Sequence, residues 1–192
     1  MHPENADAAV ARGLRETQGM VVDKATRERV NPEATQDVAP WVHAFIGVGA
    51  NLGDARATVS KACLDVGKLP GNRLLRQSSL FSSAPHEATG PDFVNAVVEI
   101  LTSLSPQSLL DQLHQLEANG DRQRPYRNAP RTLDLDVLLF DDQVIRTAAL
   151  TVPHPRMLQR AFVLLPLAEI APERVSALQL QAVNGQVIRK LM

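Results

Sequence analysis

The strongest structural signal in the chain is the run Arg131-Thr132-Leu133-Asp134-Leu135-Asp136-Val137-Leu138-Leu139-Phe140. Its apolar residues follow a proline and precede two aspartates, a pattern that is typical of a strand. Because side chains alternate along a strand, Asp134 and Asp136 share one face, with carboxylates roughly 7 Å apart by the strand rise. Leu133, Leu135 and Val137 then take the opposite face. The sequence therefore predicts a strand with one acidic face and one core face.

The acidic face has the composition of a metal–phosphate site. Two carboxylates at this spacing suit a pair of hard cations, which prefer oxygen ligands. Four arginines lie just upstream: Arg122, Arg124, Arg127 and Arg131. Arginines and magnesium ions together could share the oxygens of a polyphosphate. Alone, a D-x-D on a strand can be a solvated face, and an arginine-rich loop can be a weak anion patch. Together, and followed by Thr151-Val152-Pro153-His154, they favour the polyphosphate site.

The same region carries a family resemblance. The run Arg127-Asn128-Ala129-Pro130-Arg131-Thr132-Leu133-Asp134-Leu135-Asp136 resembles the signature of the 6-hydroxymethyl-7,8-dihydropterin pyrophosphokinases of folate biosynthesis. The resemblance extends from about Val42 to Glu173. It implies pyrophosphate transfer from ATP to 6-hydroxymethyl-7,8-dihydropterin, giving the pterin diphosphate and AMP. It also implies two magnesium ions per active site.

The resemblance assigns roles in catalysis and ATP binding. Catalytic roles fall on Arg122, Arg131, Asp134 and Asp136, and the two aspartates would ligate magnesium. A general-base role for either aspartate is the weaker alternative, since metal coordination already lowers the pKa of an attacking hydroxyl. Positions near ATP are Glu117, Arg124, Arg127, Thr151, His154 and Arg160. From the residues alone, Glu117 could be a helix-surface acid, Thr151 a loop threonine and His154 a surface histidine.

The pterin would need a flat apolar slot with a few hydrogen-bonding partners. Phe93 and Phe162 match the two family aromatics that sandwich the ring, although either could be plain core. Asn95 shares a strand face with Phe93, and its amide would cost stability if buried without a partner, so we expect a ligand there. Ser83, Ala84 and His86 lie where the family reads the pterin edge with loop backbone groups. Four positions depart from the family pattern: His86, Asn128, Ala149 and Pro155.

Composition limits the broad class of protein. The chain has 192 residues, enough for one domain with a real core, and a net charge of −1, which does not favour nucleic-acid or membrane-surface binding. The single cysteine, Cys63, cannot form an internal disulfide, which fits a reducing compartment. No apolar run is long enough for a membrane span or a signal peptide. We expect a cytoplasmic monomer.

Two regions of different composition divide the chain. Residues 1–40 are polar, mixed in charge and free of aromatic residues, so they bury too little apolar surface to offset the entropy of ordering. We expect this extension to be disordered and assign it no function. Residues 41–192 are expected to form a single pyrophosphokinase domain.

The expected elements of that domain alternate in a simple order. Strands are predicted at 41–49, 73–81, 93–101 and 131–140, and helices at 54–66, 106–119 and 160–170. The first helix begins at an Asp54 cap, the second follows Ser105-Pro106, and a left-handed cap is predicted at Asn119-Gly120. The segment 82–92 is predicted to be a loop. The order resembles a ferredoxin-like α+β sandwich, which the family resemblance also implies: a central, mainly antiparallel sheet flanked by helices.

Glycines after the first strand need a separate explanation. Gly47-Val48-Gly49-Ala50-Asn51-Leu52-Gly53 superficially suggests a dinucleotide-binding fingerprint, but its last glycine is one place too far. We expect these glycines to allow a tight turn and a close backbone approach.

Two other classes of function compete with the pyrophosphokinase. An RNA-binding ferredoxin-like module would use the arginines, but it leaves Asp134 and Asp136 unexplained, and its usual strand aromatics are absent. A metal-dependent nucleotidyl- or glycosyltransferase would use the D-x-D, but it does not explain the set Phe93, Asn95 and Phe162.

Overall fold

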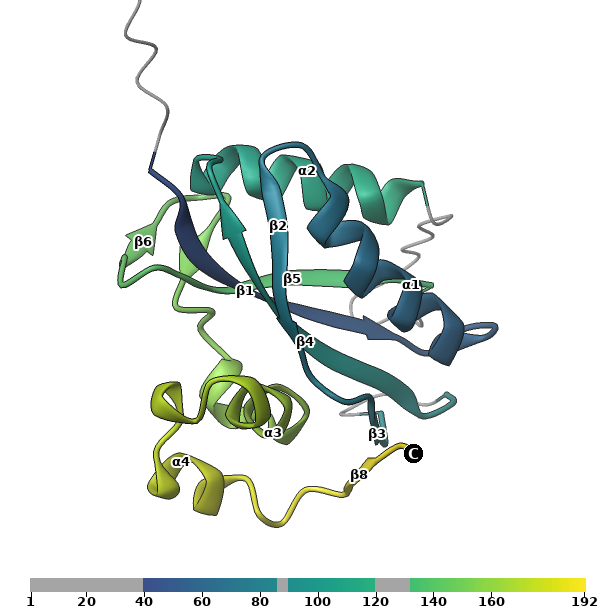
Figure 1. Ribbon diagram of the computed structural model, residues 1–192. Helices are drawn as coiled ribbons and strands as arrows, with labels where there is room; N and C mark the ends of the chain where they lie inside the picture. The colour runs from purple at the N-terminus through teal and green to yellow at the C-terminus, as the bar shows by residue number, and fades with distance from the viewer. Residues whose placement is uncertain (1–39, 86–89, 120–131) are drawn as a thin grey trace, which may run out of the picture. The chain divides into compact units, whose positions relative to one another are not determined.

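The computed structural model describes residues 40–85, 90–119 and 132–192 (Figure 1). The expected disorder of residues 1–39 concerns a segment outside the described residues. The same is true of five predicted site residues: His86, Arg122, Arg124, Arg127 and Arg131.

The described residues alternate between strands and helices. They form β1 (Val42–Ala50), α1 (Ala55–Lys68), β2 (Asn72–Gln77), β3 (Phe81–Ser83), β4 (Phe93–Thr102), α2 (Pro106–Ala118), β5 (Asp134–Phe140), β6 (Ile145–Arg146), β7 (Thr151–Val152), α3 (Ala161–Ile170), α4 (Ala177–Ala182) and β8 (Ile188–Lys190). Short 3-10 helices cover Met157–Gln159 and Pro172–Arg174. None of the helices in these ranges is long and apolar enough to cross a membrane.

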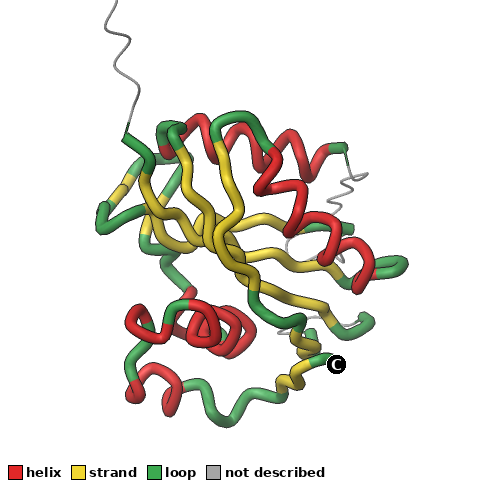
Figure 2. Tube along the Cα trace, in the orientation of Figure 1, coloured by secondary structure: helices red, strands yellow, loops and turns green. Residues whose placement is uncertain are grey.

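The strands form an antiparallel sheet in the order β5-β1-β4-β3-β8, and β2 pairs with the other end of β4 (Figure 2). A separate small hairpin joins β6 and β7. Helices α1 and α2 lie on one side of the large sheet, and α3 and α4 lie on the other (Figure 1). This arrangement confirms the expected ferredoxin-like α+β sandwich.

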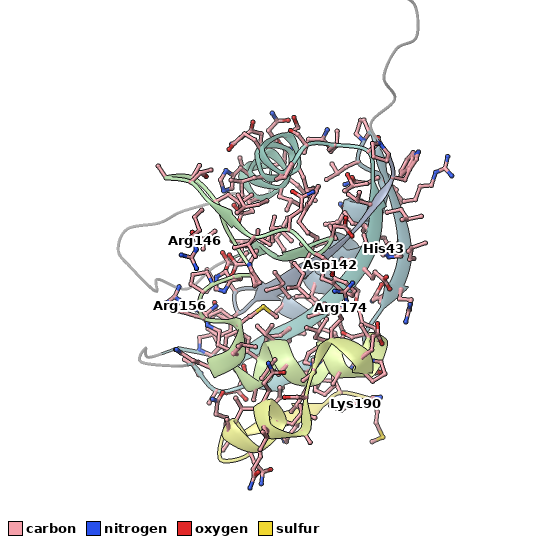
Figure 3. All side chains as sticks on the ribbon, turned by 90° about the vertical axis from the view of Figure 1, so that its left-hand side faces the viewer. His43, Asp142, Arg146, Arg156, Arg174 and Lys190 are labelled. Atoms are coloured by element: carbon pink, nitrogen blue, oxygen red, sulfur yellow. The ribbon has the colours of Figure 1, made fainter. Side chains whose placement is uncertain are left out.

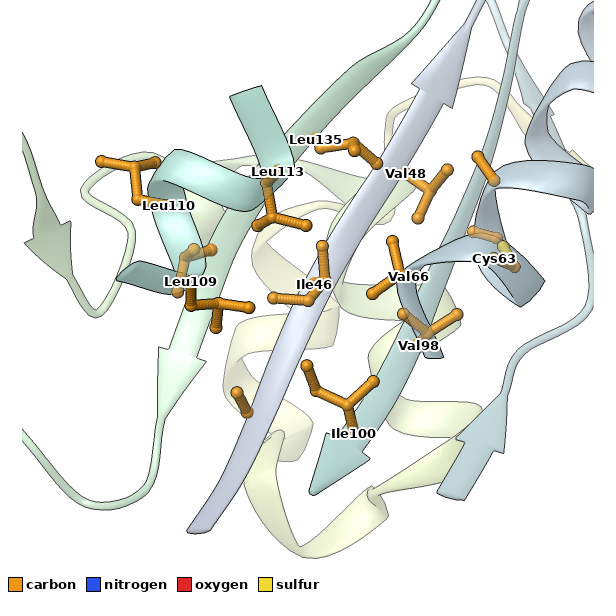
Figure 4. Packing of buried hydrophobic residues seen from close by; sticks show 14 of the residues in the cluster. Ile46, Val48, Cys63, Val66, Val98, Ile100, Leu109, Leu110, Leu113 and Leu135 are labelled. Atoms are coloured by element: carbon orange, nitrogen blue, oxygen red, sulfur yellow. The ribbon is translucent and has the colours of Figure 1, made fainter. Parts of the chain in front are cut away.

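Each face of the sheet has its own core, because neighbouring residues of β1 point to opposite sides. Ile46 packs with Val66 of α1 and Leu113 of α2 in the larger cluster (Figure 4). Phe45 packs with Leu167 of α3 in a second cluster. Leu133, Leu135 and Val137 join the larger cluster, as predicted.

Two helix starts form as expected from their caps. The Asp54 carboxylate accepts a hydrogen bond from the Ala57 N–H at 2.9 Å, and the Ser105 hydroxyl accepts one from the Ser108 N–H at 3.1 Å. The left-handed cap predicted at Asn119-Gly120 stays a prediction, because Asn119, with a φ of −67°, is the C-cap residue and the left-handed position is the residue after it. Gly120 lies outside the described residues.

The strand predicted at 73–81 is in fact divided into β2 and β3. Ser78, in the break, keeps the chain attached to β4: its N–H donates to the Val97 carbonyl at 2.9 Å, and its hydroxyl accepts from the Val97 N–H at 3.0 Å. The loop predicted from Ser82 onward was wrong at its start, because Ser82 and Ser83 belong to β3. Both serines are buried between β4 and β8, where strand pairing outweighs their polar character.

The tight turn expected in the run from Gly47 to Gly53 forms at Gly53 only. Gly47 and Gly49 lie inside β1, paired with both β4 and β5. Gly53 alone of the three has a positive φ, +60°, which a glycine adopts without strain.

Candidate active site

Asp134 and Asp136 begin β5, which pairs with β1 at one end of the strand order. Asp134 lies opposite Gly49, and Asp136 lies opposite Gly47. Both aspartates are half-buried. Gly49 has no side chain, so the backbone of β1 forms a floor beside Asp134, whereas the Leu138 side chain lies over Gly47. The strand thus presents two carboxylates, the first of them beside the floor at Gly49.

The same floor continues to Asn95 of β4, which lies opposite Gly49 on its other side. Asn95 is buried, and its amide nitrogen donates a hydrogen bond to the Ser83 hydroxyl at 3.0 Å. A Cβ at Gly49 would lie 3.3 Å from the Asn95 Oδ1, so the absence of a side chain at Gly49 leaves space for the Asn95 amide. Since Ser83 satisfies the amide nitrogen, burial of Asn95 does not by itself require a ligand.

Two basic side chains approach Asp136. The Nη1 of Arg160 and the Nε2 of His154 each lie 3.8 Å from the Asp136 Oδ2. Both contacts are longer than hydrogen bonds, and the Arg160 contact acts through charge. The His154 backbone is fixed by a 2.9 Å hydrogen bond from its N–H to the Leu138 carbonyl in β5. A carboxylate and two basic groups therefore converge at one point.

The surroundings of His154 favour its neutral form. Burial lowers the pKa of His154, and the positive charges of Arg160 and Arg156 lower it further, against the opposing effect of Asp136. The Arg156 N–H also donates to the His154 Nδ1 at 3.2 Å. Arg156 and Arg146 both lie at the left of the domain in Figure 3. Sequence reasoning missed Arg156, which no strand or helix pattern marks.

Arg160 also contacts an aromatic ring. Its guanidinium carbon lies 5.3 Å from the centre of the Phe162 ring, within the range of a cation–π interaction. Phe162 is half-buried and packs against the α3-side core. Phe93, the first residue of β4, is also half-buried and lies opposite Ser83. Both aromatics keep a partly exposed surface.

A cleft of about 200 Å³ lies between α2, β5 and the segment from Ala149 to His154. Its walls are Leu110, His114, Glu117, Asp134, Leu135, Asp136, Val137, Ala149, Leu150, Thr151 and His154. Five predicted site residues therefore meet here: both aspartates, Glu117, Thr151 and His154. Other predicted residues lie away from its walls: Ser83, Ala84, Phe93, Asn95, Arg160 and Phe162.

The contribution of α2 to the cleft was only partly foreseen. Leu110, His114 and Glu117 are spaced four and three residues apart, so they share one face of the helix. This spacing could have marked Leu110 and His114 once Glu117 was singled out. Glu117 is not the helix-surface acid allowed as an alternative, because it is only 2% exposed. Its Oε1 accepts a hydrogen bond from the Leu135 N–H at 3.0 Å.

Comparison with known proteins places this architecture in a family. The model of the 7,8-dihydro-6-hydroxymethylpterin-pyrophosphokinase (HPPK) family matches residues 45–172. The chain belongs to the HPPK family. This match spans β1 to the end of α3, so it includes both aspartates, the cleft and the Asn95 floor. It also favours a pyrophosphokinase over an RNA-binding module or a D-x-D transferase.

Individual relatives agree with the family match. The chain is 43% identical over 130 residues to the 2-amino-4-hydroxy-6-hydroxymethyldihydropteridine pyrophosphokinase of Pseudomonas aeruginosa, covering 67% of this chain and 80% of that protein. It is 38% identical over 152 residues to the enzyme of the same name from Haemophilus influenzae, covering 79% and 91%. Such identities extend well beyond the D-x-D signature.

A solved structure shares the HPPK fold. The crystal structure of Plasmodium falciparum HPPK-DHPS A437G with pteroate matches with a TM-score of 0.61 at 13% identity. The match covers 77% of this chain and 41% of that chain. At this identity the likeness concerns the fold alone.

Proposed function

We propose that this chain transfers pyrophosphate from ATP to 6-hydroxymethyl-7,8-dihydropterin, giving the pterin diphosphate and AMP, in folate biosynthesis. The family match and relatives at 38–43% identity support this reaction. One structural observation supports it most directly: Asp136 lies 3.8 Å from both His154 and Arg160, beside a cleft that also contains Asp134. Carboxylates for a metal therefore meet, at one position, an arginine and an imidazole that could bind phosphate.

The two aspartates fit magnesium. Magnesium is commonly held by one or two carboxylates, with water and substrate phosphates completing its coordination. The described ranges contain no cluster of three or more His, Cys, Asp or Glu side chains that could hold a metal alone. Two half-buried carboxylates at an open floor match the magnesium pattern. We infer that Asp134 and Asp136 hold two ions, which would neutralise the triphosphate and polarise the attacked phosphorus.

ATP would lie in the cleft beside α2 and β7. His154 and Arg160 would bind phosphate oxygens near the aspartates, while Thr151 and Glu117 border the remainder of the cleft. A neutral His154 can donate one hydrogen bond to a phosphate, and the charge would come from Arg160. Family resemblance supports phosphate roles for Arg124 and Arg127 and catalytic roles for Arg122 and Arg131.

The pterin would have one edge against the floor formed by Gly49 and Asn95. Asn95 would hydrogen-bond the ring, and Ser83, Ala84 and His86 would border its edge. Phe93 and Phe162 would contact its two faces, with offset stacking as the expected geometry. The hydroxymethyl group would then point towards the aspartates along the row that joins Asn95, Gly49 and Asp134. This row would orient the hydroxymethyl oxygen, which is the nucleophile, relative to the phosphate site. Such positioning is the main task of the protein in phosphoryl-group transfer.

We infer that residues 41–192 form the catalytic domain and that residues 1–40 are a non-catalytic extension. The family match begins at residue 45, in support of this division. We further propose that the protein acts as a cytoplasmic monomer that binds neither nucleic acid nor membrane. Its net charge of −1 and its single cysteine support this proposal.

Product analysis tests the proposed reaction. The full-length protein is incubated with ATP, magnesium and 6-hydroxymethyl-7,8-dihydropterin, and the nucleotides are separated by chromatography. The expected result is AMP and pterin diphosphate in equal amounts, with no AMP when EDTA is present or the pterin is omitted. Formation of ADP with a pterin monophosphate, or no turnover at all, would contradict the proposal.

A further inference from the structure

The side chain of Gln186, between α4 and β8, forms two hydrogen bonds on either side of Arg160. Its Nε2 donates to the Gln159 carbonyl at 2.8 Å, and its Oε1 accepts from the Ala161 N–H at 2.9 Å. One amide group therefore binds the residue before Arg160 and the residue after it. No sequence pattern marked Gln186, because its partners lie 25 to 27 residues earlier.

These two bonds compensate for a missing helix cap. The first N–H groups of a helix have no partner within the helix and need one from elsewhere. Arg160 is the N-cap residue of α3, but its side chain makes no capping hydrogen bond. Gln186 supplies an acceptor to Ala161, the first helical residue. At the same time it secures Gln159, the last residue of the preceding 3-10 helix.

The backbone of Arg160 is thereby fixed on both sides, at Gln159 and at Ala161. Its backbone is extended, with φ −125° and ψ 110°, between two helical segments. From this point its guanidinium reaches to 3.8 Å from Asp136 and lies 5.3 Å from the centre of the Phe162 ring. Any rotation of this linker would move the Arg160 side chain away from Asp136 and shift the first turn of α3, which carries Phe162.

The segment that carries Gln186 is itself well anchored. Two residues later, Ile188 of β8 pairs with Ser83 of β3, and the Leu191 N–H donates to the Leu80 carbonyl at 2.8 Å. Further along β8, the Lys190 Nζ lies 3.1 Å from the Glu169 Oε1, near the end of α3 (Figure 3 labels Lys190). The C-terminal segment thus contacts β3 by strand pairing and α3 by the contact between Lys190 and Glu169.

We propose that Gln186 is a positioning residue that sets the placement of Arg160 and Phe162 for phosphate and pterin binding. This inference rests on the proposed function, because it assigns those two residues to substrate. Gln186 contacts neither proposed substrate and acts only through its hydrogen bonds to Gln159 and Ala161. A purely structural cap would instead affect folding and leave the kinetic constants of the folded enzyme unchanged.

Three substitutions in the full-length protein separate these roles. Gln186→Ala removes both hydrogen bonds. Gln186→Glu keeps an acceptor for the Ala161 N–H but loses the donor to Gln159. Gln181→Ala is the matched control, because Gln181 is exposed on the neighbouring helix α4. For each variant, kcat and the KM values for pterin and MgATP are measured well below the melting temperature, which is recorded separately.

Gln186→Ala is expected to lower kcat/KM for the pterin by roughly tenfold to a hundredfold, the scale of loss when a binding group is misplaced. Gln186→Glu should give an intermediate value, and Gln181→Ala should match the wild type. A lower melting temperature with unchanged kcat and KM values would overturn the inference. So would wild-type values for every measurement in Gln186→Ala.

A binding measurement keeps this inference distinct from the proposed function. Dissociation constants for 6-hydroxymethylpterin, in the presence of magnesium and a non-hydrolysable ATP analogue, are obtained by fluorescence titration. Weaker binding by Gln186→Ala than by wild type supports the inference, and equal constants overturn it, whatever the turnover. Absence of AMP formation by the wild type would count against the proposed function instead.

Discussion

The Leu135 N–H donates a 3.0 Å hydrogen bond to the Oε1 of Glu117, across the interface between β5 and α2. Leu135 is the residue between the two aspartates, and the Glu117 side chain is almost fully buried. A carboxylate on α2 therefore fixes the short segment from which both proposed metal ligands project. This hydrogen bond lies on the edge of β5 opposite to the edge that pairs with β1 in the described sheet.

We predict that Glu117→Ala lowers both stability and turnover. A buried N–H that loses its acceptor costs about 1–3 kcal/mol, and the segment bearing the aspartates would gain freedom. Glu117→Gln retains an oxygen acceptor and should keep most of the stability. Chemical denaturation and steady-state kinetics provide the measurements, with Glu173→Ala, an exposed acid, as the control. Wild-type stability and turnover in Glu117→Ala would refute this role.

Glu117→Gln also separates positioning from ATP binding. If Glu117 contacts the nucleotide directly, loss of its charge should change the KM for MgATP while the melting temperature stays near that of the wild type. If it only holds β5, neither quantity should change much.

Gly49 offers a test of the proposed pterin floor. In Gly49→Ala, the added Cβ would lie 3.3 Å from the Asn95 Oδ1 and displace the amide by a few tenths of an ångström. We expect roughly tenfold weaker pterin binding with little loss of stability, since alanine suits a strand better than glycine. In Gly47→Ala, the Cβ would meet only the Leu138 side chain, at an ordinary 3.4 Å, so the effect on pterin affinity should be smaller. Fluorescence titration compares the two, and an equal or reversed order would contradict the floor.

The order of elements and the shared face of the two aspartates were predictable from sequence because both depend on local periodicity. Alternation along β5 places Asp134 with Asp136, and the same rule places Phe93 with Asn95. Caps at Asp54 and Ser105 were likewise visible, because a cap is formed by residues only three positions apart.

Contacts between distant segments could not be predicted in this way. The glycines from Gly47 to Gly53 suggested a turn, and only the pairing of β1 with two neighbours shows that Gly47 and Gly49 lie inside the sheet. Glu117 and Gln186 act on partners 18 and 25 residues away, which no periodic pattern reports. Pro85, Gly90 and Pro91 suggested a loop from Ser82 onward, and local sequence did not reveal that Ser82 and Ser83 pair with strands on both sides.

The buried Glu99 carboxylate meets two half-exposed basic side chains on the α3 side of the sheet. Glu99 of β4 contacts the His43 Nδ1 at 2.6 Å and the Arg76 Nε at 2.8 Å, and its side chain is 3% exposed (Figure 3 labels His43). Arg76 also donates a hydrogen bond to the Ile170 carbonyl at the end of α3. The cluster therefore links β1, β2, β4 and α3 through one carboxylate.

We predict that Arg76→Ala destabilises the protein by about 1–3 kcal/mol, because it leaves the buried Glu99 carboxylate poorly compensated. The double variant Arg76→Ala/Glu99→Met should recover much of this loss, since the charge that needed compensation is gone. Free energies of unfolding from urea denaturation test the pair. A double variant no more stable than Arg76→Ala would show that the Ile170 contact, and not Glu99, explains the effect.

Cys63 provides a probe of folding. Its side chain is fully buried in α1, and burial raises the pKa of the thiol to about 12. Because the thiolate is the reactive species, we predict negligible labelling by thiol reagents at pH 8 in the native protein and rapid labelling in urea. The rate is followed by absorbance with an aromatic disulfide reagent. Rapid native labelling would contradict the described packing of α1.

Asp134 and Asp136 form the proposed centre of phosphoryl transfer. Both are half-buried at an open surface, so their removal should leave the fold intact. Loss of a group that stabilises developing charge costs about 3–4 kcal/mol, or roughly a hundredfold to a thousandfold in rate.

The direct measurement is the rate of AMP formation by Asp134→Ala and Asp136→Ala at saturating ATP, magnesium and pterin, alongside their melting temperatures. We expect folded variants with a rate at least about a hundredfold below that of the wild type. Near-wild-type AMP formation by either variant would contradict a metal site at that aspartate.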